Sequence, residues 1–189
     1  SYNPLVREAI ELYLYRRRGL LSSMLALSDL YFPDIEIALD KYGLPMELRY
    51  LVIVESALNP KAISPAGAAG LWQLMLPTGR VYGLNINSLV DERMDPIRST
   101  EAASRFLKDL YKIYGDWWLV LAAYNCGPGN VNRAIKRSGL LKPNFWDIYR
   151  FLPGETRRYI PLFIGAYFAM HYSRHYGILP RELGRPLAT

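Results

Sequence analysis

The 189-residue sequence contains a single cysteine, Cys126, and only two histidines. One cysteine excludes an internal disulfide and a cysteine-rich metal site, although it leaves the cellular compartment open. The histidines, His171 and His175, lie one helical turn apart, but no neighbouring carboxylate or cysteine completes a set of ligands. We therefore expect neither a metal nor another cofactor.

Long apolar runs are absent as well. The most apolar stretches are interrupted by Glu55, or by His171 and the charged residues beyond it, so none reaches the roughly 20 residues that span a bilayer. No persistent alternation of apolar and polar residues indicates strands, and no internal repeat occurs. The sequence predicts an all-α protein without a membrane-spanning segment.

Acidic residues are outnumbered, since 17 Asp and Glu stand against 23 Lys and Arg, a formal net charge of +6. This excess favours an anionic partner, whether nucleic acid, a membrane surface or an anionic cell-wall polymer. The densest basic run, Arg16 to Arg18, has no interleaved aromatic residue and no second basic cluster beside it. We interpret it as a solvated face and expect no nucleic-acid partner.

Residues 44–60, LPMELRYLVIVESALNP, predict a helix that begins and ends near its two prolines. Counting back from Glu55 by three, four and seven residues reaches a purely apolar face, made of Val52, Leu51 and Leu48. We therefore predict that Glu55 is buried. A buried carboxyl either pairs with a cation, the more frequent structural outcome, or keeps its proton to higher pH, which suits a general acid.

Apolar spacing bounded by proline, glycine and capping residues predicts further helices over residues 4–15, 20–30, 33–42, 96–114, 117–124 and 130–138, with a last long one within 152–177. Between them, residues 61–79 are rich in glycine, proline and other small residues. Such a segment predicts a loop whose backbone can lie close to a ligand.

Four motifs occur in order along the chain: ESALNP, SPAGAAGLWQLM, AAYNCGPGNV and ETRRYIP. Each motif alone is weak evidence, but four at compatible spacing are specific. Together they resemble the lytic transglycosylases of the goose-lysozyme-like group, most closely the branch of the membrane-bound murein transglycosylase D. The resemblance covers about residues 35–171, whereas the residues before it match no motif.

This resemblance implies a lysozyme-like helical fold with extra N-terminal helices and a groove for the glycan strand of peptidoglycan. It divides the chain into an N-terminal helical extension (1–34), a transglycosylase catalytic domain (35–176) and a C-terminal tail (177–189). It also implies the periplasm or cell envelope of a bacterium, with any signal or lipid anchor outside these residues.

The resemblance assigns roles to six residues. Glu55 becomes the single catalytic acid and base, and the substrate-binding positions become Ser64, Gln73, Tyr124, Asn125 and Tyr159. Two positions depart from the family pattern without touching an expected catalytic group: Trp72 replaces a frequent methionine, and Cys126 fills the place of another small residue.

Most glycosidases use two carboxylates, and here the motifs supply only one. The nucleophile is then expected to be the 6-hydroxyl of muramic acid, so that cleavage of the MurNAc-GlcNAc β-1,4 bond leaves a 1,6-anhydro ring. A second carboxylate could still reach the groove from Asp91, Asp95 or Glu155. The alternatives are a hydrolytic lysozyme on the same fold and an inactive peptidoglycan-binding scaffold, the latter disfavoured by the intact polar motif residues.

Overall fold

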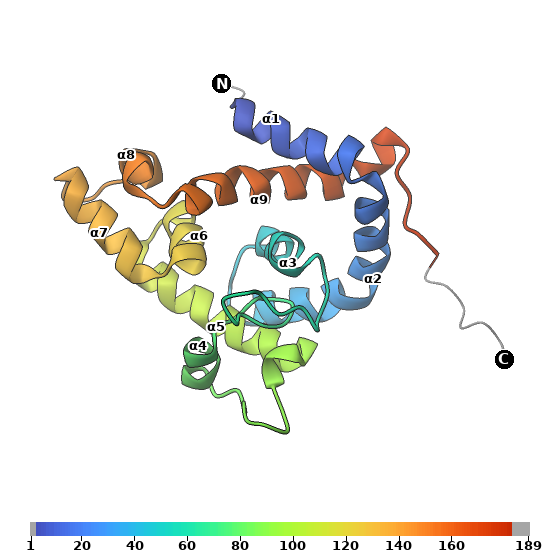
Figure 1. Cartoon of the computed structure of the whole chain (residues 1–189), viewed down its shortest axis with the longest axis horizontal. Helices are drawn as coiled ribbons and strands as arrows, with labels where there is room; N and C mark the ends of the chain where they lie inside the picture. The colour runs from blue at the N-terminus through green and yellow to red at the C-terminus, as the bar shows by residue number, and fades with distance from the viewer. Residues whose placement is uncertain (1–2, 183–189) are drawn as a thin grey trace.

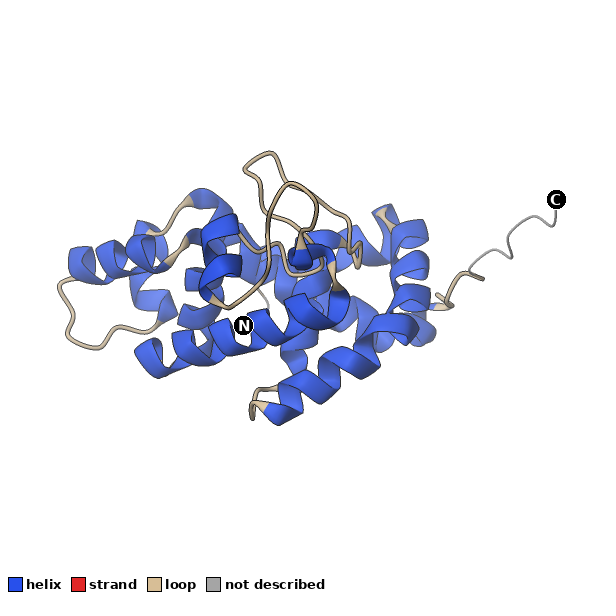
Figure 2. Cartoon of the chain, turned by 90° about the horizontal axis from the view of Figure 1, so that it is seen from below, coloured by secondary structure: helices blue, strands red, loops and turns tan. Residues whose placement is uncertain are grey.

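The computed structural model describes residues 3–182, and within that range every regular element is helical (Figure 1). Figure 2 shows the same body from below, with the longest loops rising from one side of the helices. Strand-like pairing among the described residues is limited to isolated bridges, such as Ile63 with Ala69. The all-α prediction is confirmed.

The α-helices are α1 (Pro4–Glu11), α2 (Arg18–Lys41), α3 (Leu51–Ser56), α4 (Leu76–Val81), α5 (Pro96–Tyr114), α6 (Trp117–Cys126), α7 (Pro128–Ser138), α8 (Phe145–Ile148) and α9 (Gly154–Tyr172). A π-helical turn, η1 (Leu12–Arg16), joins α1 to α2. Short 3-10 turns are η2 (Met46–Tyr50), η3 (Glu92–Met94), η4 (Tyr149–Phe151) and η5 (Ser173–Tyr176).

Helices α5 and α6 begin at capping aspartates. Asp95 accepts hydrogen bonds from the backbone N–H groups of Ile97 and Arg98, both at 2.9 Å, and Asp116 accepts one from Trp118 at 2.8 Å. These bonds satisfy N–H groups that have no partner within a helix. The predicted starts of both helices are confirmed.

The prediction of separate helices over 20–30 and 33–42 is wrong, because α2 runs through Pro33 without a break. Proline removes one backbone hydrogen bond and crowds the preceding turn, which bends a helix rather than always ending it. Figure 1 shows α2 changing direction part-way along its length. Met24 before the proline and Leu39 after it are both 0% exposed, so the two halves pack into one core.

The helix predicted over 44–60 is shorter than expected. Its first part is η2, and α3 ends at Ser56, because Ala57 and Leu58 take left-handed φ angles of 51° and 61°. The Leu58 N–H bonds back to the carbonyl of Val52 at 3.2 Å, which closes the helix end. Glu55 therefore lies in the last turn of α3, at the edge of a loop.

Helix α9 connects the N-terminal helices to the rest of the core. It runs beside α1 (Figure 1) and also contacts α3 and α6. Gly165 makes the approach to α1 possible, since an added Cβ would stand 2.7 Å from the Cβ of Ala9. The division at residue 34 stays a prediction, and residues 183–189 of the predicted tail lie outside the described residues.

Candidate active site

Glu55 lies where two adjoining cavities meet. One, here called the Arg17 cavity, has a volume of about 500 Å³ and extends toward η1 and the start of α2. The other, the Asn125 cavity, has a volume of about 460 Å³ and extends toward α6 and the start of α9. All six residues implied by the motifs line the Asn125 cavity: Glu55, Ser64, Gln73, Tyr124, Asn125 and Tyr159.

Glu55 as a whole residue is half-buried rather than buried, whereas its carboxyl, the group that the prediction concerns, is largely removed from solvent. The left-handed turn after Ser56 ends α3 at once, and the carboxyl lies where the two cavities meet, beside the Tyr159 hydroxyl. Loss of hydration still raises the pKa of Glu55 from 4.5 to about 7, and the negative charge of Glu155 adds to that rise. At neutral pH the carboxyl is therefore both a proton donor and a proton acceptor.

Tyr159, on α9, acts on the same carboxyl. Its hydroxyl is buried and has no hydrogen-bond partner of normal geometry among the described residues, yet it is close enough to hold the pKa of Glu55 down. Burial, followed by the Glu55 charge, raises the pKa of Tyr159 well above its ordinary value, so the phenol stays a neutral donor. Such loose contacts commonly tighten when a ligand binds.

The last turn of α6 carries Tyr124 and Asn125. The Tyr124 hydroxyl donates to the backbone carbonyl of Trp72 at 2.5 Å, so it ties α6 to the loop after α3. The Oδ1 atom of Asn125 accepts a hydrogen bond from the Thr156 hydroxyl at 2.9 Å. Among residues 3–182 nothing accepts from the Asn125 amide nitrogen, which leaves that group available to a ligand in the cavity.

Ser64 and Gln73 belong to the loop that forms the opposite wall. The Ser64 hydroxyl accepts from the N–H of Ala68 at 3.0 Å. Gln73 has a φ of 49°, and its side-chain nitrogen donates to the carbonyls of Ala62 at 3.0 Å and Gly70 at 2.9 Å. Both residues therefore fix the shape of the loop as well as lining the cavity.

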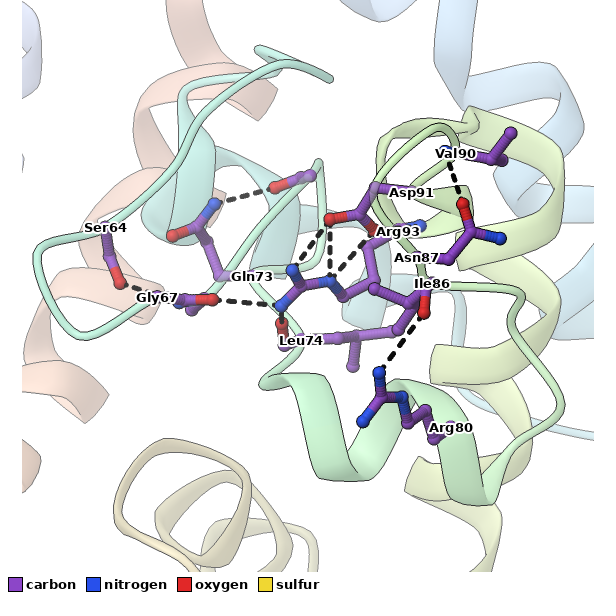
Figure 3. A network of polar contacts seen from close by, with 12 residues as sticks. Ser64, Gly67, Gln73, Leu74, Arg80, Ile86, Asn87, Val90, Asp91 and Arg93 are labelled. Atoms are coloured by element: carbon purple, nitrogen blue, oxygen red, sulfur yellow. Dashed lines mark hydrogen bonds and ion pairs between the residues drawn. The ribbon is translucent and has the colours of Figure 1, made fainter.

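Hydrogen bonds from the Arg93 side chain hold this loop in place (Figure 3). The side chain is buried, and its Nη1 donates to the carbonyls of Gly67 at 2.9 Å and Leu74 at 3.0 Å, while Nη2 pairs with Asp91 at 2.7 Å. Sequence reasoning missed Arg93, because nothing in the run DERMD indicates that its one cation is buried. The loop is thus a rigid wall rather than a flexible connector.

Of the three acidic residues considered as a second carboxylate, only Glu155 lines a cavity with Glu55. Hydrogen bonds from Arg93 lower the pKa of Asp91, and Asp95 caps α5, so both have structural partners. Glu155 is exposed in the first turn of α9, where a negative charge is favoured by the helix dipole. Over residues 3–182, no group of three or more His, Cys, Asp and Glu side chains is arranged to hold a metal.

Residues 34–146 match the model of the Transglycosylase SLT domain family. The chain belongs to this family. It is 38% identical over 179 residues to membrane-bound lytic murein transglycosylase D of Escherichia coli K12, covering 93% of this chain and 39% of that protein. It is 31% identical over 139 residues to membrane-bound lytic murein transglycosylase F of Shewanella pealeana, covering 67% and 28%. The family resemblance predicted from the motifs is confirmed.

The fold of this SLT domain matches that of the 70 kDa soluble lytic transglycosylase of E. coli. That solved structure superposes with a TM-score of 0.64 at 23% identity, over 90% of this chain and 30% of the larger protein. The predicted lysozyme-like helical fold is confirmed. The chain spans about two fifths of the length of murein transglycosylase D.

Substitutions of Tyr159 and of Glu155 are expected to shift the pKa of Glu55 in opposite directions. Tyr159→Phe removes a hydroxyl that lowers the pKa of Glu55, so the pKa should rise; Glu155→Gln removes a negative charge that raises it, so the pKa should fall. A titration of the Glu55 side chain followed by carbon NMR measures both shifts. Unchanged values in both variants would leave burial as the sole cause.

Proposed function

We propose that this SLT domain is the catalytic part of a peptidoglycan lytic transglycosylase. It cleaves the β-1,4 bond between MurNAc and GlcNAc without water and leaves a 1,6-anhydro-MurNAc end. The observation that carries the proposal is Glu55, whose pKa of about 7 gives it both protonation states at neutral pH, in a cavity that it shares with the five candidate substrate-binding residues. Membership of the SLT family and the names of the relatives support the same activity.

One carboxyl is sufficient for the reaction. Protonated Glu55 gives its proton to the glycosidic oxygen as the bond from C1 of MurNAc to that oxygen breaks. The resulting carboxylate then takes the proton of the C6 hydroxyl, whose oxygen forms the new bond to C1. The bond from C1 to the glycosidic oxygen is replaced by one from C1 to O6, Glu55 regains from the C6 hydroxyl the proton that it gave to the leaving oxygen, and no water is consumed.

The surrounding side chains take supporting roles in this proposal. Tyr159 donates to Glu55 while it is charged, which fits its effect on the pKa of that carboxyl. The available amide nitrogen of Asn125 suits a sugar hydroxyl or an N-acetyl oxygen. Ser64 and Gln73 present the loop wall, and Tyr124 holds that wall through Trp72, so its own contribution is mainly to position the loop.

A hydrolytic muramidase is the second candidate, and Glu155 is the observation that favours it. Its carboxylate lines the same cavity as Glu55 and acts on it electrostatically, so it could orient a water molecule as a general base. The exposure of Glu155 argues for the transglycosylase, since an exposed carboxylate is poorly fixed for directing one water molecule.

The proposed substrate places the protein in the periplasm or cell envelope of a bacterium, with peptidoglycan rather than nucleic acid as its partner. No helix within the described residues is long and apolar enough to cross a membrane.

Digestion of purified peptidoglycan in heavy-oxygen water separates the candidates. A transglycosylase takes its new C1 oxygen from the substrate, so the anhydro fragments should carry no label in mass spectra. A parallel digestion with a hydrolytic muramidase provides the control, because its new reducing ends must be labelled. Labelled reducing ends from this protein, abolished in Glu155→Gln, would replace the proposal by the hydrolase, and intact glycan that co-sediments with the protein would indicate a binding scaffold.

A further inference from the structure

The three consecutive arginines of the basic run are all exposed but point to different surroundings. Arg16 lines a separate hollow between α1 and α9, whereas Arg17 lines the Arg17 cavity beside Glu55. Arg18 donates to the carbonyls of Tyr176 at 3.0 Å and Gly177 at 3.2 Å. The π-helical turn η1 ends at Arg16, and the residue after it, Arg17, has the non-helical angles φ −118° and ψ 33°. Turns of this kind are frequent at functional sites.

The N-terminal segment builds one wall of the Arg17 cavity. Leu12 and Leu20 supply apolar surface, and Ile63 of the loop after α3 also lines the cavity. Glu55 is a lining residue too, so this wall belongs to the space that contains the proposed catalytic acid. A substrate that extends from Glu55 toward η1 would therefore meet an apolar surface with one cation, Arg17.

The charge of Arg17 has no acidic counterpart. Among the described residues no carboxylate lies within ion-pair distance of it, and Glu55, itself neutral in part at pH 7, is the sole acidic residue lining the cavity. Arg17 acts instead on Tyr13, where its charge partly offsets the rise in pKa caused by burial. The Asn125 cavity differs, because Arg158 shares it with Glu155. An unbalanced cation in a partly apolar cavity favours an anionic group of a ligand.

We propose that Arg17 binds a carboxylate on the muramoyl side chain of a strand that lies across Glu55. The inference rests on the proposed function, since it takes the ligand to be a peptidoglycan strand. Two sources supply this chemistry: the free carboxylates of a stem peptide, and the lactyl carboxylate that is exposed once the stem is removed. Methyl groups on either side chain fit the apolar wall. The N-terminal segment thereby sets a preference among differently substituted strands.

Cleavage of three kinds of strand tests the proposal: strands with stem peptides, strands with a free lactyl carboxylate, and strands whose lactyl group is converted to a neutral amide. Arg17→Gln should lower kcat/KM about tenfold, the usual size of one charge-assisted hydrogen bond, on a strand whose carboxylate Arg17 binds. Loss on the first strand alone assigns the stem, and loss on the second assigns the lactyl group. The loss should shrink at high salt, because screening weakens an exposed charge pair.

Arg16→Gln is the matched control. It removes the same charge from the neighbouring residue, which lines a different hollow, and it should leave all three rates unchanged. Arg17→Lys keeps the charge and should retain most of the activity. Equal loss on all three strands, the neutral one included, would overturn the inference, and so would no loss on any. Failure of the wild type to cleave any strand would instead refute the proposed function, and the inference with it.

Discussion

Glu55→Gln should abolish glycan cleavage while leaving the fold intact. An amide can neither give a proton to the glycosidic oxygen nor take one from the C6 hydroxyl, and general acid-base catalysis commonly supplies about 10²- to 10⁴-fold in rate. Because one residue performs both transfers in the proposed mechanism, a loss on the order of 10³-fold or more is expected. Release of soluble fragments from purified peptidoglycan measures it, and cleavage near the wild-type rate would refute the assignment of Glu55.

The same substitution should stabilise the protein in one pH range. The pKa of Glu55 is raised from 4.5 to about 7, so the folded state binds the proton more tightly than the unfolded state between these values. Stability therefore falls as the pH rises from about 4.5 to 7, and the full cost is present above 7. A rise from 4.5 to about 7 corresponds to roughly 3 kcal/mol of destabilisation, since one pKa unit is about 1.4 kcal/mol.

Thermal unfolding of both proteins at pH 4 and pH 8 tests this reasoning. Glu55→Gln should have the higher melting temperature at pH 8, whereas the two should melt together at pH 4, where glutamate is protonated and resembles glutamine. A difference in melting temperature that is the same at both pH values would mean that packing rather than ionisation causes it.

Sequence reasoning located both ends of α5 and the start of α6, where the deciding contacts are local, although α7 begins at Pro128 rather than at the predicted residue 130. Asp95 and Asp116 cap their helices through backbone groups two or three residues away, and Gly115 ends α5 with a φ of 63°. Each boundary depends on one side chain and the turn next to it, which is the information that a short sequence window contains.

Sequence reasoning failed at helix boundaries that depend on contacts with residues distant in the chain. Nothing near Ser56 ends α3 in the sequence, but its hydroxyl interacts with the carbonyl of Leu71 at 2.8 Å, and Leu58 is fully buried two residues on. Because of these contacts, the helix ends at Ser56 rather than near Pro60 as predicted. Pro33 shows the converse, because the core on both sides of it keeps α2 continuous.

The residues of the site also differ in whether the sequence alone could identify them. The motif residues could be named from their order along the chain, and they do line one cavity with Glu55. Arg93 could not be found, since its importance lies in two carbonyls 19 and 26 residues earlier in the chain. Arg17 was assigned only to a solvated face, because its place beside Glu55 depends on how η1 and α2 pack against the loop after α3.

The loop that carries Ser64 and Gln73 should be most sensitive at Gly70. This residue is buried with a φ of 84°, and an added Cβ would stand 1.8 Å from the carbonyl oxygen of Arg93. That oxygen belongs to the backbone and cannot rotate away, so the loop or η3 must shift. Such displacement would also disturb the hydrogen bonds by which the Arg93 side chain holds Gly67 and Leu74.

Gly67→Ala is the matched control, because Gly67 has a similar φ of 89° but nothing within 4 Å of an added Cβ. It should show only the cost of a left-handed alanine, about 1–2 kcal/mol. Gly70→Ala adds a backbone clash, so we expect a loss of about 4 kcal/mol or more in the free energy of unfolding, together with loss of glycan cleavage as Gln73 moves. Urea unfolding and fragment release compare the two variants. Equal destabilisation would mean that left-handed strain alone limits the loop, and that its close contact with Arg93 is not required to hold the wall of the site.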